Sequence, residues 1–388
     1  MLDRVLGMQS GTSHDGIDMA VVEFTGRGDE LLADVVWYDE VEYSPALRRM
    51  ILQALPPGQV SAEELCRIDV GVGEEFARAA AHAQHVSGGF DAVCSHGQTM
   101  FHGVDDTRVW GTLQVGQAAW IAEACGVPVV SDVRIRDVAA GGQGAPLVAI
   151  LDMKLGARLH GSSAFVNLGG IANVTLVQPG TGVLAFDIGP ANALIDAAMS
   201  SHPNTPAPFD RGGAAARRGR VNQAVLSRLL DEPYYKRASP KTTGKELFNA
   251  DYLHRNATGT DGDDLVATLT ELTAQVVSHA IISLSPDHVF LSGGGVRNTT
   301  LLARIAHLVA PRPVQPTDAL GVPSDAKEAV AFALIGWMTL HGLPASIPSV
   351  TGARGSRILG SITPGDRHLN LGSINCSPTS IVVRASSR

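Results

Sequence analysis

The first candidate for phosphate chemistry is the polar, glycine-rich segment at residues 10–16, which lies between two predicted strands. Backbone N–H groups in such a turn can converge on an anion, and Thr12 and Ser13 add hydroxyl donors. Asp15 and Asp18 supply carboxylates that could hold Mg²⁺ beside phosphate oxygens. The residue types predict a phosphate site, and an ordinary β-hairpin turn is the alternative.

Three further glycine-rich segments follow predicted strands. At residues 187–192, a carboxylate stands between a strand and a helix N-terminus, where it can meet a ligand or cap the helix. At residues 292–295, three consecutive glycines allow a flat ring or a ribose to approach the backbone, with a tight turn as the alternative. Residues 139–146 could form a hinge or line a cleft. Two phosphate-type turns and one nucleoside-type turn together predict nucleotide binding better than any one of them.

Motifs of other enzyme classes are absent from the sequence. There is no GxxxxGK[ST], and residues 240–245 have some letters of that motif without its spacing. The HRD and DFG motifs of protein kinases are also missing. His96 and His102 lack the HxxxH or HxxE spacing of zinc sites, so hydrogen-bonded loop histidines are favoured over metal ligands.

The composition argues against a nucleic-acid-binding or membrane protein. Net charge is −8, without a long run of Lys and Arg. None of the four cysteines lies in a CxxC pair, so neither a zinc site nor a disulfide framework is implied. The first 15 residues lack a signal-peptide pattern, and the most apolar stretch, at 329–340, is shorter than the about 20 residues that span a bilayer. We therefore expect a cytoplasmic protein.

Strands and helices alternate along the chain, and the pattern restarts. The order strand, glycine-rich turn, strand, strand, helix at the beginning recurs from Ala164 to the helix after Asn192. A chain of 388 residues is too long for one compact core. We therefore expect two α/β domains with a cleft between them.

The domain boundaries follow from this repeat. Residues 1–130 are assigned to domain I, which a C-terminal helix at about 324–342 completes, and residues 131–323 are assigned to domain II. Residues 367–388 show no clear period and are expected to form a poorly ordered tail.

Local signals predict several element ends. Ser61 and Glu64 have the spacing of a capping box at the start of a helix. A short buried strand at 91–95 is expected to run into a polar loop at 96–102. Ser324 is expected to cap the last helix.

These segments resemble the anhydro-N-acetylmuramic acid kinase family in their residue motifs and in the order of those motifs along the chain. The series is highly specific because the matches run in order from about residue 6 to residue 340. The matching segments are residues 11–18, 95–99 with His102, 132–146, 167–173, 186–192, 209–213, 292–298 and 323–329. The resemblance implies the actin/Hsp70/sugar-kinase fold, with two actin-like (ribonuclease H-like) α/β domains and an active-site cleft between them.

The resemblance also implies ATP and Mg²⁺ as cofactors and a set of site residues. The residues implied for binding ATP and its phosphates are Gly11, Thr12, Ser13, His14, Asp15, Gly16, Ile17, Asp18, Gly169, Gly170, Asn173, Gly189, Asn192, Gly293, Gly294, Gly295 and Asn298. Those implied for the sugar are Thr99, Arg134, Asp187 and Glu328. Asp15 and Asp18 would hold Mg²⁺.

The family's reaction has ATP phosphorylate O6 of 1,6-anhydro-N-acetylmuramic acid while water opens the anhydro bridge at C1, giving N-acetylmuramic acid 6-phosphate and ADP. Since O6 is an ether oxygen without a proton to lose, the base is needed for the water, and Asp187 matches that base. Arg134 could bind the lactyl carboxylate in a bidentate pair, with an ion pair to Asp132 or Asp137 as the alternative. The family further implies a cytoplasmic homodimer that acts in peptidoglycan recycling and amino-sugar catabolism.

The chain departs from the family pattern at a few positions. Gln9 stands within Met8-Gln9-Ser10, where the family usually has Met followed directly by Ser. Ile188 replaces Thr and Ala191 replaces Gly in the second loop. The change at 188 removes a hydroxyl beside the catalytic carboxylate, which is a possible donor to phosphate or water.

Two function classes besides the kinase remain open from the sequence. One is a hydrolase that opens the sugar without ATP, which a requirement for nucleotide and Mg²⁺ would exclude. The other is a nucleotide-dependent binding or regulatory protein without turnover, supported only by the changes at 188 and 191. Metal-dependent carbamoyl-transfer enzymes of the same fold that modify tRNA are disfavoured by the missing HxxxH pair and the acidic charge.

Overall fold

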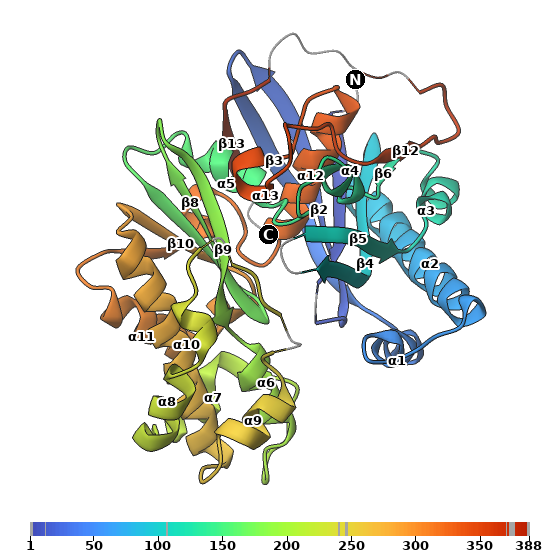
Figure 1. Cartoon of the computed structure of the whole chain (residues 1–388). Coiled ribbons are helices and arrows are strands. Elements are labelled where there is room, and N and C mark those ends of the chain that lie inside the picture. The colour runs from blue at the N-terminus through green and yellow to red at the C-terminus, as the bar shows by residue number, and fades with distance from the viewer. Residues whose placement is uncertain are drawn as a thin grey trace. The chain divides into compact units, whose positions relative to one another are not determined.

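The chain forms two compact units in a computed structural model. Unit 1 comprises Met1–Arg158 with Leu320–Arg388, and unit 2 comprises Leu159–Ala319 (Figure 1). Residues 131–158 therefore belong to unit 1, whereas the sequence placed them in domain II. The reason is that β6 (Val129–Ser131) pairs with strands of unit 1 on both of its sides. The structure describes residues 3–11, 13–105, 108–239, 241–244, 247–369, 371 and 377–385.

Unit 1 is built on a mixed sheet with the strand order β12-β6-β4-β1-β2-β3-β13, and β5 pairs with β4 beside this path. β1, β2 and β3 form an antiparallel meander, and β4 and β6 then add in parallel on the other side of β1. The strands besides β6 are β1 Arg4–Ser10, β2 Gly16–Arg27, β3 Glu30–Glu42, β4 Ala92–Asp105, β5 Arg108–Val115, β12 Ser361–Thr363 and β13 Ser380–Ala385.

Unit 2 has a sheet in the order β11-β10-β7-β8-β9. β7, β8 and β9 are an antiparallel meander, and β10 and β11 add in parallel on the other side of β7. The five strands of unit 2 have the same order and directions as the strands β6-β4-β1-β2-β3 of unit 1. The repeat predicted from the sequence is therefore confirmed, because both units are α/β structures whose sheets share this strand order. The strands are β7 Ser163–Leu168, β8 Ile171–Gln178, β9 Gly182–Pro190, β10 His288–Ser292 and β11 Val314–Pro316.

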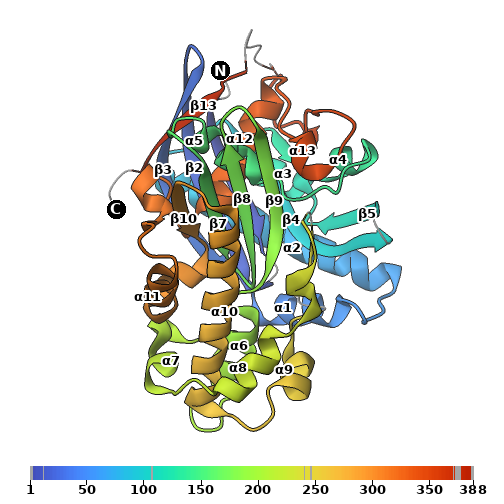
Figure 2. The same ribbon diagram turned by 60° about the vertical axis from the view of Figure 1, so that its left-hand side comes forward.

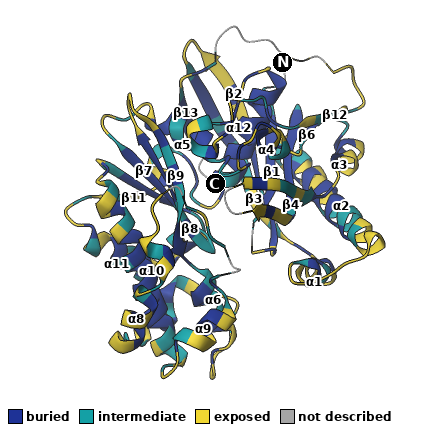
Figure 3. Ribbon diagram, in the orientation of Figure 1, coloured by how far each residue is buried: buried dark blue, intermediate teal, exposed yellow. Residues whose placement is uncertain are grey.

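In unit 1, alternate residues of β1 serve opposite faces of the sheet. Leu6 and Met8 belong to the core cluster shared with α1, α2 and α3. On the other face, α12 lies so close to β1 that a Cβ at Gly7 would be 2.0 Å from the carbonyl oxygen of Ala329. The central strands and α12 are buried (Figure 3). The helices are α1 Pro45–Ala54, α2 Ala62–Ser87, α3 Ala118–Cys125, α4 Ile135–Ala139, α5 Ala149–Gly156, α12 Lys327–Leu340 and α13 Pro348–Thr351.

In unit 2, the long helix α10 runs along the sheet (Figure 2). Its length and apolar composition would suit a membrane span, but 72% of its most apolar window is buried inside the protein. It is therefore the central core helix of unit 2, packed with α6, α7, α8 and α11. The helices are α6 Ala193–Ser200, α7 Ala214–Arg218, α8 Gln223–Leu230, α9 Ala250–Asn256, α10 Gly262–Leu284 and α11 Thr299–Leu308.

Several local predictions are confirmed and others are wrong. The capping box of Ser61 and Glu64 is present at the start of α2. The expected loop at 96–102 is instead the second half of β4, because β5 pairs with it. Ser324 does not cap α12, which begins at Lys327 with Ala326 at its N-cap, and α12 is followed by the short helix α13.

The expected tail at 367–388 is also wrong in part. Ser380–Ala385 forms β13, which pairs in parallel with β3 and buries Ile381 and Val383. A partner strand some 350 residues away in the chain stabilises this segment, so its own short pattern was insufficient to reveal it. The tail residues 370, 372–376 and 386–388 lie outside the described residues.

Candidate active site

The turn between β1 and β2 is held by its own backbone and by Ser10. The amide of His14 donates to the carbonyl of Gly11 at 3.2 Å, and His14 adopts a left-handed φ of 53°. Ser10 Oγ lies 2.7 Å from the carbonyl oxygen of Gly16 and also 2.7 Å from Gln98 Oε1. This fixes the ends of the turn at which phosphate binding was predicted. Thr12, its first predicted hydroxyl donor, lies outside the described residues.

Glycine is required at the end of this turn, and the residue after it serves the core. A Cβ at Gly16 would be 2.4 Å from the carbonyl oxygen of Val41, so no side chain fits there. Ile17 is buried in the core of unit 1. The side chain of Ile17 therefore cannot contact a ligand, and only its backbone remains available for the predicted role.

The two acidic residues of this segment differ in environment. Asp15 is exposed and accepts a 2.5 Å hydrogen bond from Ser13 Oγ. Asp18 is largely buried and accepts one of 2.8 Å from Gln9 Nε2. Burial raises the pKa of Asp18 to about 7, although the hydrogen bond from Gln9 lowers it. The negative charges of Glu40, Glu328 and Asp15 add to the increase.

Arg134 is partly buried, and two acceptors hold its guanidinium. Its Nε donates to His96 Nε2 at 2.7 Å, and its Nη1 donates to the carbonyl of Gly144 at 2.7 Å. Burial lowers the pKa of Arg134 to about 10, and the carboxylate of Glu328 opposes that decrease. Asp137, proposed as an alternative partner, instead accepts from the Gly144 amide at 2.9 Å. Arg134 is thus oriented by neutral groups, with Glu328 as a charged neighbour.

His96 is a neutral acceptor in this arrangement. Because its Nε2 accepts from Arg134, the ring proton is on Nδ1, which donates to the carbonyl of Gly97 at 2.9 Å. Burial, and then the charge of Arg134, hold the pKa of His96 well below its ordinary value. Within the described part of the chain no group of three or more His, Cys, Asp and Glu could hold a metal ion. Both ring nitrogens of His96 therefore take part in hydrogen bonds.

Thr99 and Glu328 complete the predicted set in unit 1. Gln114 Nε2 donates to Thr99 Oγ1 at 3.2 Å and to Thr112 Oγ1 at 2.8 Å, which ties Thr99 to the β5 strand. Glu328 lies in the first turn of α12, and the close approach of α12 to β1 at Gly7 brings this carboxylate near Asp18.

In unit 2, the turn at Gly169 and Gly170 is bonded to the start of α6. The amides of Ala191 and Ala193 donate to the carbonyl of Gly170 at 3.0 Å. Asn192 donates to the carbonyl of Gly169 with its amide at 3.0 Å and with its side-chain Nδ2 at 2.9 Å. The side chain of Asn192 therefore fixes the turn, which gives it a structural role.

Asp187 lies on β9 opposite Asn173 of β8 in the strand register. Its Oδ2 accepts hydrogen bonds from Thr242 Oγ1 at 2.8 Å and from the amide of Thr243 at 3.1 Å. The neighbouring Ile188 is 2% exposed and belongs to the core of unit 2. Position 188 therefore turns its side chain away from the carboxylate.

Packing explains the residue type at two other positions in unit 2: Ala191, which departs from the family pattern, and Gly189, which was predicted to bind ATP. Ala191 is fully buried in the core of unit 2. A Cβ at Gly189 would be 2.9 Å from the ring of Tyr235, so this glycine makes room for an aromatic side chain.

The Gly293–Gly295 loop follows β10 and packs on β7. A Cβ at Gly293 would be 2.4 Å from Asn167 Oδ1, and one at Gly295 would be 2.6 Å from the Cβ of Leu168. Gly294 differs, because no atom lies within 4 Å of a Cβ placed there. Asn298 accepts from the amide of Leu301 at 3.0 Å and caps α11, so its side chain has a structural role.

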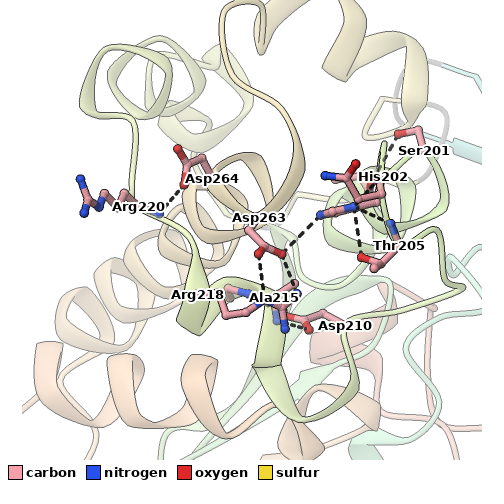
Figure 4. Close-up of polar contacts among 12 residues, drawn as sticks. Ser201, His202, Thr205, Asp210, Ala215, Arg218, Arg220, Asp263 and Asp264 are labelled. Carbon is pink, nitrogen blue, oxygen red and sulfur yellow. Dashed lines mark hydrogen bonds and ion pairs between the residues drawn. The ribbon is translucent and has the colours of Figure 1, made fainter.

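The segment at 209–213, which matches the family pattern, is held in place by hydrogen bonds. Asp210 accepts from the amides of Ala215 and Ala216 at 2.8 and 3.0 Å, at the N-terminus of α7 (Figure 4). Close by, Arg218 pairs with Asp263 through two hydrogen bonds (Figure 4). This network fixes the path of the chain toward Gly213, whose Cβ position would be 2.2 Å from Asn298 Oδ1.

Within each unit, the structure brings some of the predicted residues together. In unit 1 it brings together the β1–β2 turn, Arg134 and Glu328, with Thr99 on β4. In unit 2 it brings together the glycine turns and Asp187. The sequence did not predict the side chains that hold these residues, which are Gln9, Gln114, Tyr234, Thr242 and Thr243. Gln9 stands out in the sequence only as a departure from the family pattern, and the segment at 240–245 only as an incomplete phosphate-loop motif.

Comparison with known proteins gives one consistent result. The family model described as "Anhydro-N-acetylmuramic acid kinase" matches residues 3–365. A protein of that name from Streptomyces coelicolor is 48% identical over 373 residues, which are 95% of each chain. One from Rhodococcus erythropolis is 46% identical, covering 98% of this chain and all of the relative. Among solved structures, an activator of the 2-hydroxyisocaproyl-CoA dehydratase from Clostridium difficile superposes with a TM-score of 0.41 and 12% identity, over 86% of this chain and 94% of that one.

Proposed function

The chain belongs to the anhydro-N-acetylmuramic acid kinase family, and we propose that it transfers the γ-phosphoryl group of ATP to O6 of 1,6-anhydro-N-acetylmuramic acid while water adds to C1. The oxygen of water bonds to C1 and the C1–O6 bond breaks, so the electron pair of the broken C1–O6 bond stays on O6. O6 then bonds to the γ-phosphorus and ADP leaves. The products are N-acetylmuramic acid 6-phosphate and ADP.

Asp187 takes the proton of the attacking water in this proposal. Asp187 lies on β9 opposite Asn173 of β8, and a single carboxylate suits a general base. A glycosidase would need a second carboxylic acid to protonate the leaving oxygen. Here the phosphoryl group captures that oxygen instead, so one base is sufficient.

The observation that carries nucleotide binding concerns three glycines in the three predicted loops. Gly11, Gly169 and Gly294 have room for a Cβ, with no neighbouring atom closer than 3.5 Å. None of them has the left-handed φ that favours glycine. Packing and backbone conformation therefore leave glycine unexplained at these positions, whereas a ligand that approaches the backbone explains it.

The residues of the β1–β2 turn fit a bound Mg²⁺ by their chemistry. Carboxylate and hydroxyl oxygens are the ligands that Mg²⁺ prefers, and the ion usually keeps waters and phosphate oxygens in its shell. The negative charges that raise the pKa of Asp18 are of the kind that a cation offsets. We propose that Asp15 and Asp18 hold the ion. When bound, it would neutralise charge on the transferring phosphoryl group.

For the sugar, we propose that Arg134 binds the lactyl carboxylate and that Thr99 and Glu328 contact the ring substituents. The pre-oriented guanidinium supports this, since Nε and one Nη1 proton are already engaged and the remaining donors keep a fixed direction. We further propose a cytoplasmic homodimer that feeds peptidoglycan fragments into amino-sugar catabolism, without a nucleic-acid or membrane partner.

The deciding assay compares wild type with Asp187→Asn in the presence of ATP, Mg²⁺ and the anhydro sugar, following ADP and sugar phosphate. We expect wild type to form both products and Asp187→Asn to lose nearly all turnover while it still binds ATP. Asp231→Asn, an exposed aspartate of unit 2, is the matched control and should keep full activity. Opening of the sugar without ATP would instead identify a hydrolase. Absence of ADP formation by wild type would reject the kinase.

A further inference from the structure

The segment at residues 241–243 lies alongside β9 at Asp187, although 55 residues separate Thr242 from Asp187 in the chain. The amide of Asp187 donates to the carbonyl of Lys241 at 3.0 Å. In return, Thr242 Oγ1 and the amide of Thr243 both donate to Asp187 Oδ2. The segment thus contacts the backbone and the carboxylate of one residue, which fixes both relative to each other.

An aromatic cluster anchors the segment. Lys241 Nζ donates to the carbonyls of Tyr234 and Tyr235 at 3.2 and 3.1 Å and lies 4.7 Å from the ring centre of Tyr234. Tyr234 is buried, and its ring packs edge-on against Phe248. Its hydroxyl donates to the carbonyl of Asp187 at 2.7 Å. The cluster therefore grips the strand at Asp187 directly and also through Lys241.

We propose that Thr242 is a positioning residue for the general base, which holds the Asp187 carboxylate in the orientation that meets the attacking water. A terminal carboxylate rotates broadly about its last torsion unless hydrogen bonds fix it. Ile188, the nearest neighbour in sequence, cannot fix it because its side chain lies in the core. The hydroxyl that contacts the carboxylate comes instead from Thr242. The effect of Thr242 on catalysis rests on the proposed function, whereas its hydrogen bond to Asp187 does not.

The role predicts a particular kinetic signature. A misplacement of a catalytic group by about 1 Å can cost on the order of 100-fold in rate. Thr242→Val has nearly the same shape and lacks the donor, so we expect kcat to fall about 10- to 100-fold with the KM for ATP unchanged. Thr242→Ser retains a hydroxyl and should recover most of the lost kcat. A merely structural threonine would instead show lower stability without rescue by serine.

The experiment measures kcat, KM and melting temperature for wild type, Thr242→Val and Thr242→Ser. Thr181→Val, an exposed threonine in the β8–β9 turn of the same unit, is the matched control and should behave as wild type. Wild-type kcat in Thr242→Val, or an equal loss in valine and serine variants, would overturn the positioning role.

A second measurement keeps the inference testable without turnover. The ¹³C resonance of the Asp187 carboxyl, assigned by its absence in Asp187→Asn, is titrated in wild type and in Thr242→Val. Hydrogen bonds to a carboxylate favour its ionised form, so loss of the Thr242 donor should move the titration midpoint above that of wild type. An unchanged midpoint would reject the contact in solution. Failure of wild type to phosphorylate the sugar, with a shifted midpoint, would reject the proposed function and leave the contact standing.

Discussion

Arg134 and the buried His96 form a pair in which the guanidinium donates from Nε to Nε2 of the imidazole at 2.7 Å. Histidine accepts here although the partner is a cation, which requires the neutral ring. Burial and the charge of Arg134 hold the pKa of His96 well below its ordinary value, so the ring stays neutral across the physiological range. The pair directs the remaining guanidinium donors without cancelling their charge, which leaves that charge for an anionic substrate group.

Replacement of His96 should therefore weaken sugar binding more than it affects ATP. His96→Phe keeps a ring against Phe332 but leaves the buried Nε of Arg134 without its acceptor, at a cost of about 1–3 kcal/mol. We expect the KM for the sugar to rise about tenfold and the KM for ATP to stay constant. His96→Gln, which offers an acceptor oxygen, should lose less. Initial-rate kinetics test this prediction, with His85→Phe at an exposed position as the control. If His96→Phe kept the wild-type KM for the sugar, the prediction would be contradicted.

The turns of the site could be predicted because their signals are local. Glycine and Asx residues between short strands mark a turn within a few residues, and the prediction of the loop after Ser292 is correct. The strand expected to end at Asp187 instead continues to Pro190. The partners that hold those turns are distant in sequence. Thr242 meets Asp187 across 55 residues, and no local period announces that meeting.

The same limit explains the errors in the fold. The half of β4 after Ser95 is polar, so it reads as a loop until β5 pairs with it. β13 follows a segment rich in Gly, Ser and Pro, and its two buried residues are too few to identify a strand without its partner β3. Strand pairing, rather than residue pattern, decides both segments.

Gly294→Ala should separate ligand binding from folding. No atom lies within 4 Å of the added Cβ and the backbone is not left-handed, so the melting temperature should stay within about 1 °C of wild type. If a nucleotide approaches this backbone, one extra methyl group should raise the KM for ATP about tenfold or more. Thermal unfolding and ATP titration check the two parts. Gly26→Ala, at another open glycine position, is the control; unchanged ATP affinity in Gly294→Ala would remove this loop from the nucleotide site.

Gly7→Ala, unlike Gly294→Ala, should lower the free energy of unfolding. The added Cβ would lie 2.0 Å from the carbonyl oxygen of Ala329 and 2.5 Å from the amide nitrogen of Ala333, both backbone atoms of α12. The helix must move away from β1, which costs about 1–3 kcal/mol of unfolding free energy and displaces Glu328. All four tryptophans, Trp37, Trp110, Trp120 and Trp337, lie in unit 1, so their fluorescence in urea reports on this unit. Gly26→Ala on β2 should unfold as wild type, and a Gly7→Ala midpoint equal to it would show that α12 packs less closely.

Lys154 gives a pH-dependent prediction. Its side chain is almost fully buried on α5, where Nζ donates to the carbonyl of Pro378 in the C-terminal segment. Burial lowers the pKa of Lys154 from 10.5 to about 8. Between these values the unfolded chain binds more protons at this residue than the folded chain, so stability rises with pH across that window. Below pH 8 the cost of burying the charge is fully present.

Lys154→Met removes this titration, and the comparison isolates it from other groups. From pH 7 to pH 10, wild type should gain about 2 kcal/mol of unfolding free energy relative to Lys154→Met. The measurement is urea unfolding followed by tryptophan fluorescence, which follows unit 1. Arg67→Met, at an exposed arginine of unit 1, should show a constant difference from wild type over the same range. A constant difference for Lys154→Met as well would mean that the ammonium group reaches water in solution, and that the Pro378 contact does not hold it in the core.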